Sequence, residues 1–534
     1  MHWLDFEDTR TRLLGRCLRQ QAEALPDADF LIEGETHYSY GRVNELVNGF
    51  ARGFRQCGVR KGDTVSLFME SGSDVVFCAL ALNKLGAIWT PVNTDYKGAW
   101  LRETFEDGGA RLLVADAALL PRVAELEGLG FERVLVRGHA ETALPFPAEP
   151  LEAFRELVGE EPDDSALHYG DATCILWTSG TTGRAKGVVQ NHNVWIRAAV
   201  DGAVNTRLQK GDRIYSCLPM YHTAAWVANV FRALVTGIPC AMDPRFSASD
   251  FWNRTRYYDA TMVFTLGAMH MFLWNAPERD DDAKNPVRVA GMVPMPEDLI
   301  PRFKARFGIE EIHQGYGQSE AMSALSRRPG RSYKPNSLGE PTEGVEARLL
   351  DDEDREVAVG EPGELCLRPT EPFALFNGYW RNPEATVAAW RNLWYHTGDL
   401  MRRDEDGELF FVDRKKDFIR YKGRNISSFA VEAAVGAHPA VLQCAAHGIP
   451  SEELEHEAEV KVCVVRKPGV ALEAEELCRF VNETAPYFFV PRYVEFLEEL
   501  PQTPTNRVQK YKLRERGLSP ETWDARAAGF EVKR

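Results

Sequence analysis

The residues best suited to chemistry lie between Ile175 and Gly187, where a short apolar run gives way to glycine and hydroxyl residues. The apolar residues 174–177 predict a buried strand. Glycines let the following backbone turn tightly and present its N–H groups, and hydroxyl side chains add further donors. The glycines are Gly180, Gly183 and Gly187, the hydroxyl residues are Thr178, Ser179, Thr181 and Thr182, and the cation is Lys186. The stretch predicts a loop that wraps phosphate oxygens, and we call residues 178–187 the phosphate loop.

The phosphate loop does not have the spacing of a Walker A loop. A Walker A loop follows the pattern Gly-x-x-x-x-Gly-Lys, whereas only two residues separate Gly180 from Gly183. A solvated turn is the alternative explanation for a cluster of Ser, Thr and Gly. A strand followed at once by so many donors and a lysine favours phosphate binding.

The length and composition indicate a globular protein with more than one domain. At 534 residues the chain exceeds the size of one simple core. Hydrophobic residues make up 44% and charged residues 27%, as in ordinary globular chains. The formal net charge of −16 argues against a general nucleic-acid-binding protein, because there is no basic excess to neutralise phosphates. Local positive charge could still hold a small anion.

Neither the cysteines nor the N-terminal residues indicate secretion. The ten cysteines are scattered from Cys17 to Cys478 without a Cys-x-x-Cys pair, which is typical of unpaired thiols in a reducing compartment. The N-terminal residues are acidic and lack the basic-then-apolar order of a signal peptide. The most apolar long stretch, 215–242, is interrupted by a proline, a histidine, an asparagine and an arginine. We therefore expect no membrane-spanning helix and a cytoplasmic protein.

Alternating strands and helices must position the phosphate loop. Helical periodicity closed by a glycine predicts a helix over 40–57, and a second helix is expected over 73–85 with Ser73 as its N-cap. An apolar helix is expected around Trp226 and Val230. Strands are predicted at 64–69, 87–91, 112–115, 213–218, 261–266, 287–292 and 310–314. This alternation predicts an α/β fold with a parallel sheet covered by helices.

The remaining segments differ in character from this alternating pattern. The proline-rich and acidic segment 144–171 is expected to be a surface connection, and the charged segment 279–285 an exposed loop. Residues 364–368 and 408–413 are expected to form antiparallel strands. A small mixed α/β module follows, with helices at 429–437 and 473–485 and strands at 442–448 and 460–465.

Five further motifs follow the phosphate loop along the chain. They are Gly315-Tyr-Gly-Gln-Ser-Glu320, Tyr395-His-Thr-Gly-Asp399, Asp413-Arg-Lys-Lys-Asp417, Tyr421-Lys-Gly-Arg-Asn425 and Pro501-Gln-Thr-Pro-Thr-Asn-Arg-Val508. In this order they resemble the acyl-adenylate-forming superfamily, which contains acyl-CoA synthetases, adenylation domains and luciferases. The resemblance covers nearly the whole chain and is strongest to small- and medium-chain acyl-CoA ligases, including the carnitine-CoA ligase-like branch.

The resemblance implies a fold and a two-step reaction. Residues 1–412 would form a large domain of parallel and mixed sheets with flanking helices and a distorted β-barrel. A hinge at 413–416 would join it to a small mobile α+β domain, residues 417–534. An acid would attack the α-phosphate of ATP, giving an acyl-adenylate and pyrophosphate, and a thiol, usually of coenzyme A, would displace AMP. The phosphate loop and magnesium would supply the positive charge that this attack needs.

The resemblance also implies roles for single residues. Glu320 corresponds to the magnesium-binding carboxylate, and Ser319 to a phosphate-contacting residue that is usually threonine. The other implied positions are Thr178 in the phosphate loop, Tyr316 with Gly317 at the adenine, Asp399 and Arg414 at the ribose, Lys416 at the hinge and Gly423 near the thiol tunnel. Singly, such residues are often a solvated charge, a core aromatic or a turn residue, so the ordered set carries the assignment.

A compact acyl pocket is expected next to the phosphate loop. His222 matches the position at which the family often has a histidine or an aromatic residue at the mouth of this pocket, although a satisfied interior histidine is the alternative. The other expected lining residues are Trp226, Met220, Met292, Met322, Gly267 and Gly315. Because the large side chains leave little depth, we expect a compact or planar acid and not a long fatty acid.

The tail motif departs from the family pattern. Members commonly carry a lysine there that bridges the carboxylate and the α-phosphate oxygens, and Arg507 stands at that position. Arginine keeps the charge, but its planar fork is not interchangeable with a compact ammonium. Arg507 is the first choice for this role, Lys510 is the second, and Lys512 lies close by.

Three functions remain open at this point. The leading one is an ATP- and magnesium-dependent ligase that passes a small acid to coenzyme A. A homodimer is a possible assembly for it. A second is an adenylating ligase with another acceptor, which forms an amide or activates an oxyanion such as nitrite for attack by an amine. A third is a nucleotide-binding protein without turnover, which is motivated only by Arg507.

Overall fold

The computed structural model describes residues 1–139, 141–178, 185–415, 417–421, 424–451, 458–502 and 508–533. The chain forms two compact units. The first contains Met1–Glu346 and Arg368–Trp390, and the second contains Ala347–Leu367 and Arg391–Arg534. The predicted α/β class is confirmed, whereas the hinge at 413–416 stays a prediction.

One seven-stranded sheet of the first unit carries the phosphate loop. Its strand order is β7-β6-β5-β3-β4-β8-β9. The strands are β3 (Thr64–Phe68), β4 (Ile88–Pro91), β5 (Leu112–Asp116), β6 (Arg133–Arg137), β7 (Ala148–Pro150), β8 (Ala172–Thr178) and β9 (Lys186–Asn191). Neighbouring strands are parallel except β8 and β9, which form an antiparallel pair. The phosphate loop therefore connects β8 to its partner β9, which is the strand at one edge of the sheet.

A second seven-stranded sheet lies in the same unit, with the order β14-β13-β12-β10-β11-β1-β2. The strands are β1 (Asp29–Glu33), β2 (Thr36–Ser39), β10 (Ile214–Ser216), β11 (Cys240–Met242), β12 (Met262–Leu266), β13 (Val289–Val293) and β14 (Glu311–His313). Only β1 and β2 pair antiparallel. The parallel strands β12 and β14 therefore end on one side, next to Gly267 and Gly315, where open α/β sheets bind ligands.

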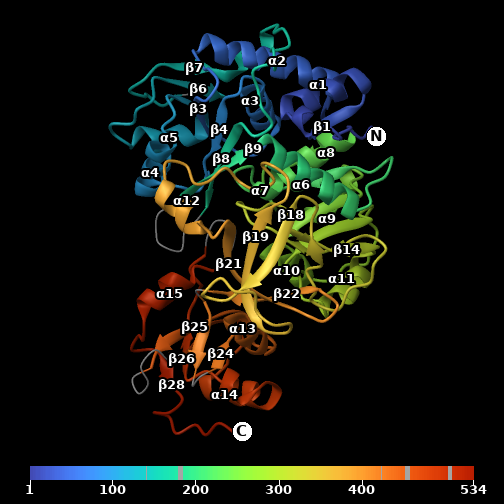
Figure 1. The fold of residues 1–534 in the computed structure, drawn as a ribbon. Coiled ribbons are helices and arrows are strands. Elements are labelled where there is room, and N and C mark those ends of the chain that lie inside the picture. The colour runs from blue at the N-terminus through green and yellow to red at the C-terminus, as the bar shows by residue number, and fades with distance from the viewer. Residues whose placement is uncertain are drawn as a thin grey trace. The chain divides into compact units, whose positions relative to one another are not determined.

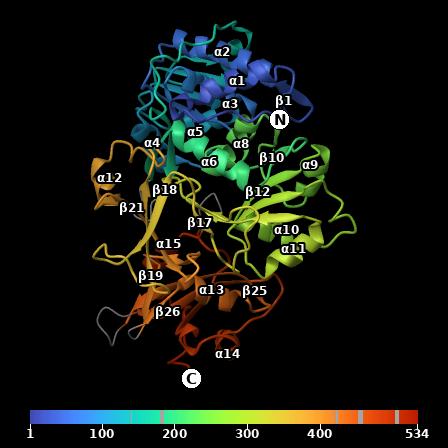
Figure 2. The ribbon, with the colours of Figure 1, turned by 45° about the vertical axis from the view of Figure 1, so that its right-hand side comes forward.

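Helices pack on both sheets, and α1, α2 and α3 form one group of neighbours (Figures 1 and 2). The helices are α1 (Leu14–Ala24), α2 (Tyr40–Gln56), α3 (Ser73–Lys84), α4 (Gly98–Gly108), α5 (Leu120–Ala124), α6 (His192–Asn205), α9 (Phe251–Tyr257), α10 (Ala268–Asn275) and α11 (Leu299–Phe307). Every residue of α3 is buried, as expected for a helix with apolar residues all round. One large core joins residues of both sheets and of these helices except α4 and α5, whose buried residues belong to a second core.

Two predictions in this unit need correction. Ser73 is not the N-cap of α3, because Gly72 occupies that position. The hydroxyl of Ser73 instead donates to Glu33 Oε2 at 2.6 Å. The segment 144–171 is not merely a surface connection, since it contributes β7 and buries Leu151 and Phe154.

The apolar helix predicted around Trp226 is present but irregular. It consists of α7 (Thr223–Ala225), a π-helical turn η4 (Trp226–Val230) and α8 (Phe231–Thr236). π-Helical turns are rare and are frequent at functional sites. The turn begins four residues after His222, in the segment expected to form the acyl pocket.

An antiparallel sheet forms part of the second unit. Its strands are β18 (Val345–Leu350), β19 (Pro362–Pro369), β20 (Trp390–Arg391), β21 (Trp394–Arg403) and β22 (Leu409–Arg414). The strands predicted at 364–368 and 408–413 are β19 and β22, but they do not pair with each other. β21 lies between them and pairs antiparallel with both. The prediction was wrong on the pairing because it treated 395–399 only as a motif.

The C-terminal part of the second unit contains the predicted helices and strands. The predicted ones are α13 (Ser428–Gly436), α14 (Ala474–Thr484), β25 (Val441–Pro450) and β26 (Ala458–Arg466). The sequence analysis did not predict α15 (Lys510–Arg516), β27 (Tyr493–Phe496) and β28 (Trp523–Asp524). The strands form one sheet in the order β25-β26-β27-β28. A separate apolar core joins this sheet to the helices, which confirms a small α+β C-terminal module.

Two other expectations concern the whole chain. All ten cysteines are unpaired, and most are buried, as expected for small apolar residues. Among the helices of the described residues, none has the length and apolar character needed to cross a membrane.

Candidate functional site

The two ends of the phosphate loop lie opposite each other. Thr178 and Lys186 are paired residues of β8 and β9, and the Thr178 hydroxyl donates to the Lys186 carbonyl oxygen at 3.3 Å. The other predicted phosphate ligands, Ser179, Gly180, Thr181, Thr182 and Gly183, lie outside the described residues. The strand pair thus places the hydroxyl of Thr178 and the cation of Lys186 at the mouth of the loop.

A tyrosine connects the phosphate loop to the predicted metal ligand. The ammonium of Lys186 lies 4.8 Å from the centroid of the Tyr379 ring, and the Tyr379 hydroxyl donates to Glu320 Oε1 at 2.9 Å. The segment that carries Tyr379 runs along β9, because Val189 N–H donates to the Gly378 carbonyl at 3.0 Å. The structure therefore brings together Lys186 and Glu320, as the predicted site requires.

Sequence reasoning missed Tyr379. The only local signal is the run Asn377-Gly-Tyr-Trp380, in which two aromatic residues follow a glycine in a turn-like stretch. No residue pattern in this run indicates that the segment packs against β9, which is distant in sequence.

Ser319 is held from two sides. Its Oγ lies 3.1 Å from Thr223 Oγ1, and its carbonyl oxygen accepts a hydrogen bond from Gln190 Nε2 at 2.6 Å. Gln190 is a fully buried residue of β9. The same strand that begins with Lys186 thus also fixes the backbone immediately before Glu320.

The glycines of the 315–320 motif are required by close backbone approach. Gly315 and Tyr316 form the short strand β15, which pairs with β16 (Leu325–Ser326). A Cβ on Gly315 would lie 2.8 Å from the Leu325 carbonyl oxygen, and one on Gly317 would lie 2.9 Å from the Ser323 nitrogen. Larger residues would shift the backbone on both sides of Tyr316, which is itself half-buried. The contact of Tyr316 with adenine stays a prediction.

His222 is a helix cap. Its Nδ1 accepts a hydrogen bond from Ala224 N–H at 3.1 Å, at the start of α7. Burial lowers the pKa of His222 to about 4, so the ring is neutral at pH 7. Gly267, at the end of β12, has a φ of 39°, a conformation that favours glycine. The place of His222 at the pocket mouth stays a prediction.

The large side chains predicted to line the pocket are rigidly packed. The Trp226 indole N–H donates to the Met220 carbonyl at 2.7 Å, and its ring centroid lies 4.4 Å from that of Trp89. Trp226, Met292 and Met322 are almost completely buried. That these side chains line an acyl pocket stays a prediction.

The predicted ribose ligands are paired in the second unit. Asp399 and Arg414 face each other across β21 and β22, and Arg414 Nε lies 3.0 Å from Asp399 Oδ1. The Asp399 side chain is 1% exposed, and that of Arg414 is 34% exposed. Lys416 and Gly423 lie outside the described residues.

Lys510 takes part in a buried network of the second unit. Its ammonium donates to Ser428 Oγ at 2.6 Å and lies 2.8 Å from Glu432 Oε1. Burial raises the pKa of Glu432, and Lys510 opposes that shift. Lys510 thus neutralises a mostly buried carboxylate, and its place as second choice for the family's lysine role stays a prediction. Arg507 lies outside the described residues.

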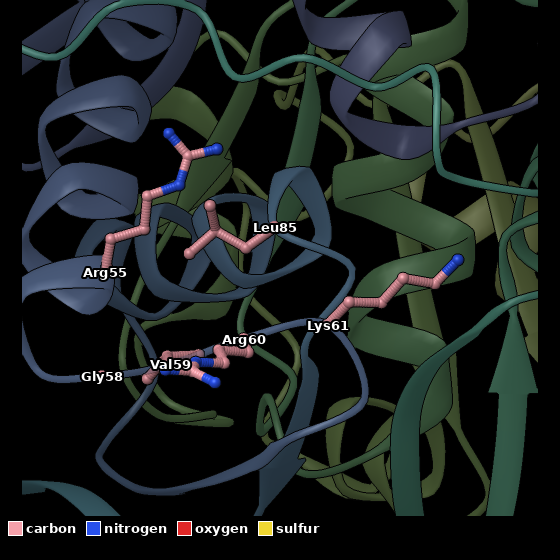
Figure 3. A pocket seen from close by; sticks show the side chains of 6 residues that line it. All are labelled: Arg55, Gly58, Val59, Arg60, Lys61 and Leu85. Carbon is pink, nitrogen blue, oxygen red and sulfur yellow. The ribbon is translucent and has the colours of Figure 1, made fainter.

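A separate hollow lies at the C-terminal ends of α2 and α3 (Figure 3). Its volume is about 340 Å³, and Arg55, Arg60 and Lys61 contribute its charge. None of the predicted site residues lines this hollow, so it is not the candidate site.

The chain is similar to known adenylate-forming enzymes. The AMP-binding enzyme family matches residues 18–380, and the AMP-binding enzyme C-terminal domain matches residues 430–507. A crotonobetaine/carnitine–CoA ligase of Salmonella arizonae is 30% identical over 489 residues, which cover 90% of this chain and 93% of that protein.

Solved structures of two ligases have the same fold. An anthranilate CoA ligase in complex with anthranoyl-AMP has a TM-score of 0.83 and 25% identity, covering 94% of this chain and 96% of that chain. A benzoate CoA ligase from Burkholderia xenovorans has a TM-score of 0.82 and 24% identity, covering 94% of this chain and 99% of that chain.

Proposed function

Because the chain belongs to the AMP-binding enzyme family and is an acid–thiol ligase, we propose that its substrate is a small, compact organic acid. The acid would be adenylated with ATP, with release of pyrophosphate, and the acyl group would pass to coenzyme A. The three ligases described above are named for carnitine and crotonobetaine, for anthranilate and for benzoate, which are compact acids. Another similar structure, 26% identical, is a fatty acyl CoA synthetase of Mycobacterium tuberculosis, so the limit on size is our own proposal. The tight packing of Trp226 and Met292 supports the same size limit.

One observation carries this proposal: the alignment of Lys186, Tyr379 and Glu320 at the phosphate loop. The cation of β9 and the carboxylate of Glu320 are connected through one aromatic residue, Tyr379. Pyrophosphate departure needs positive charge close to the phosphates. Lys186 supplies one such charge, and the Thr178 hydroxyl beside it supplies a donor.

Magnesium fits the residues at Glu320. A carboxylate oxygen is the ligand type that this hard cation prefers, and it commonly binds through one carboxylate plus substrate phosphates. Glu320 is half-buried, and Tyr379 fixes its orientation. Bound magnesium would neutralise charge on the phosphates, while the chain's own residues orient them.

Residues of the second unit would bind the ribose and supply the charge at the reacting carboxylate. Asp399 would accept hydrogen bonds from the ribose hydroxyls, and Arg414 would hold its carboxylate in place. Arg507 would bring the charge that reaches the reacting carboxylate. This choice is supported by Lys510, whose ammonium already neutralises Glu432.

The proposal is tested by pyrophosphate release across a panel of acids, with and without coenzyme A. We expect release with short or planar acids, and acyl-CoA formation only when coenzyme A is present. Best turnover with long fatty acids would exclude the compact pocket. Product formation with an amine or nitrite in place of coenzyme A would favour the second candidate function, and nucleotide binding without release would favour the third.

A further inference from the structure

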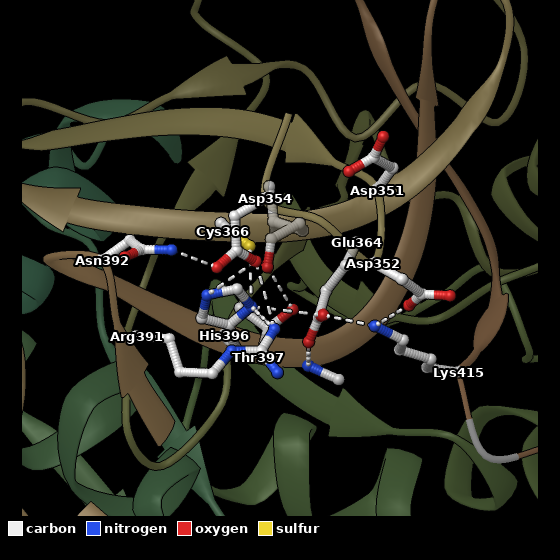
Figure 4. A network of polar contacts seen from close by, with 12 residues as sticks. Asp351, Asp352, Asp354, Glu364, Cys366, Arg391, Asn392, His396, Thr397 and Lys415 are labelled. Atoms are coloured by element: carbon white, nitrogen blue, oxygen red, sulfur yellow. Dashed lines mark hydrogen bonds and ion pairs between the residues drawn. The ribbon is translucent and has the colours of Figure 1, made fainter. Parts of the chain in front are cut away.

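A buried carboxylate links the two strands that carry the Asp399–Arg414 pair (Figure 4). Glu364 of β19 is 4% exposed. Its Oε2 lies 2.9 Å from the Lys415 ammonium and 3.2 Å from His396 Nδ1. Glu364 therefore contacts His396, which precedes Asp399 in β21, and Lys415, which directly follows Arg414 at the end of β22.

The other oxygen of Glu364 holds the backbone beside Asp399. Gly398 N–H donates to Glu364 Oε1 at 3.0 Å, and the Gly398 carbonyl accepts from Lys415 N–H at 2.9 Å. Gly398 has a φ of 73°, which glycine adopts without strain. Gly398, the residue that precedes Asp399, is thus held at its N–H by the Glu364 carboxylate and at its carbonyl by the main-chain N–H of Lys415.

The charges of this network are balanced within the protein. Burial alone would raise the pKa of Glu364, but hydrogen bonds from His396 and Lys415 lower it to about 2. Glu364 is therefore ionised at all ordinary pH values. The Lys415 ammonium also lies 2.8 Å from Asp352, whose side chain is 87% exposed.

A metal site is the competing interpretation of the same cluster. Glu364, Cys366 and His396 offer three ligand atoms that all lie within 4.8 Å of one another. However, burial raises the pKa of the Cys366 thiol, and Arg391 Nη2 already lies 3.0 Å from His396 Nδ1. Two protein cations, Lys415 and Arg391, therefore already lie against two of the three candidate ligands.

We propose that Glu364 and Lys415 are positioning residues for nucleotide binding, because they fix the backbone that aims the Asp399 carboxylate at the ribose. The inference rests on the proposed function of Asp399. Neither residue touches the nucleotide in this scheme. They would affect nucleotide binding indirectly, because they hold Gly398 and thereby the Asp399–Arg414 pair in place.

A double-mutant cycle tests this inference. ATP affinity is measured by calorimetry for wild type, Lys415→Met, Asp399→Asn and the double variant. Lys415→Met is expected to weaken ATP binding about tenfold in the wild-type background and less than twofold in the Asp399→Asn background. Glu364→Gln, which keeps an acceptor for Gly398 N–H but loses the charge, is expected to behave like Lys415→Met.

Asp352→Asn is the matched control, because it removes the exposed partner of the same ammonium. ATP affinity should stay within twofold of wild type, since exposed ion pairs contribute little. Thermal midpoints identify any variant that fails to fold, and Glu364→Gln then replaces Lys415→Met in the cycle.

The outcomes separate the inference from the function on which it rests. If Lys415→Met weakens binding equally in both backgrounds, its effect is merely structural and the positioning role is wrong. If Lys415→Met and Glu364→Gln both leave ATP affinity unchanged, the positioning role is wrong as well. If Asp399→Asn itself leaves ATP affinity unchanged, the ribose assignment of Asp399 fails first.

Discussion

Tyr379 is the residue whose position says most about the candidate site. Its ring lies against the Lys186 ammonium, and its hydroxyl donates to Glu320. A cation next to an aromatic face and a phenol on a carboxylate are both oriented contacts. Tyr379 therefore restricts the directions in which the cation and the carboxylate can point.

We predict that Tyr379→Phe lowers kcat/KM for pyrophosphate release about tenfold or more. A hydrogen bond to a charged group contributes roughly 1.5–3 kcal/mol, and the variant loses it while keeping the ring. Pyrophosphate release at varied ATP concentration provides the measurement. Tyr257→Phe is the control, because Tyr257 is 52% exposed. Equal kinetics for both variants would remove Tyr379 from the site.

Arg507 and Lys510 make a second comparison at this scale. Arg507→Ala is expected to reduce pyrophosphate release by at least a hundredfold, corresponding to about 2.7 kcal/mol of transition-state stabilisation. Lys510→Ala should instead lower the thermal midpoint, because it leaves the buried Glu432 without its cation. Wild-type-like release from Arg507→Ala would refute the first choice for the family's lysine role.

At the scale of elements, the strand β9 and the helix α6 connect the site to the core. β9 begins at Lys186, and α6 begins at His192 directly after it. His192 is 1% exposed, and its Nδ1 accepts a hydrogen bond from Leu14 N–H at 3.2 Å. The start of α6 is thereby fixed to the start of α1 through a neutral imidazole.

This arrangement predicts a stability loss in acid. Burial lowers the pKa of His192 to about 3, whereas in the unfolded chain it is about 6.5. The unfolded state therefore takes up a proton first as the pH falls below 6.5, and stability is lost down to about pH 3. Between pH 7 and pH 5 this histidine should account for roughly 2 kcal/mol.

His192→Asn isolates that contribution, since the asparagine oxygen can accept the hydrogen bond from Leu14 but does not titrate in this range. Urea unfolding at pH 7 and pH 5 should show a smaller loss for this variant than for wild type. His139→Asn is the control, because His139 is exposed. The same pH dependence in wild type and His192→Asn would show that His192 does not titrate as described.

At the scale of the molecule, the chain divides its predicted ligands between two units. The phosphate loop, Tyr316 and Glu320 belong to the first, whereas Asp399, Arg414 and Lys510 belong to the second. Two half-reactions with different partners are expected to need two arrangements of the predicted domains 1–412 and 417–534, with the change at Lys416, which lies within the second unit.

Lys416→Pro tests this expectation, because proline fixes φ and removes the backbone N–H. We expect one half-reaction to stay within about threefold of wild type and the other to fall by at least a hundredfold. Pyrophosphate release reports the first half-reaction, and thioester formation from isolated acyl-adenylate reports the second. Lys416→Ala, which removes the charge but not the backbone freedom, should leave both unchanged. An equal fall of both rates in Lys416→Pro would argue against a hinge at this position.

The sequence alone determined the features that depend on short stretches of chain. The phosphate loop, the alternating strands and helices and the ordered motifs could all be predicted, because periodicity and turn residues act over a few neighbouring positions. The same local signals named Thr178 and Lys186, which the structure pairs across β8 and the unpredicted strand β9, whereas phosphate binding by the loop stays a prediction.

Only the tertiary structure decided which distant segments meet. It placed Tyr379 against β9, inserted β21 between β19 and β22, and put the Lys510 ammonium on Glu432. These contacts join residues whose separation along the chain carries no local pattern. They form because burying apolar faces brings the segments together, and each polar group then finds a partner among whatever neighbours the packing provides.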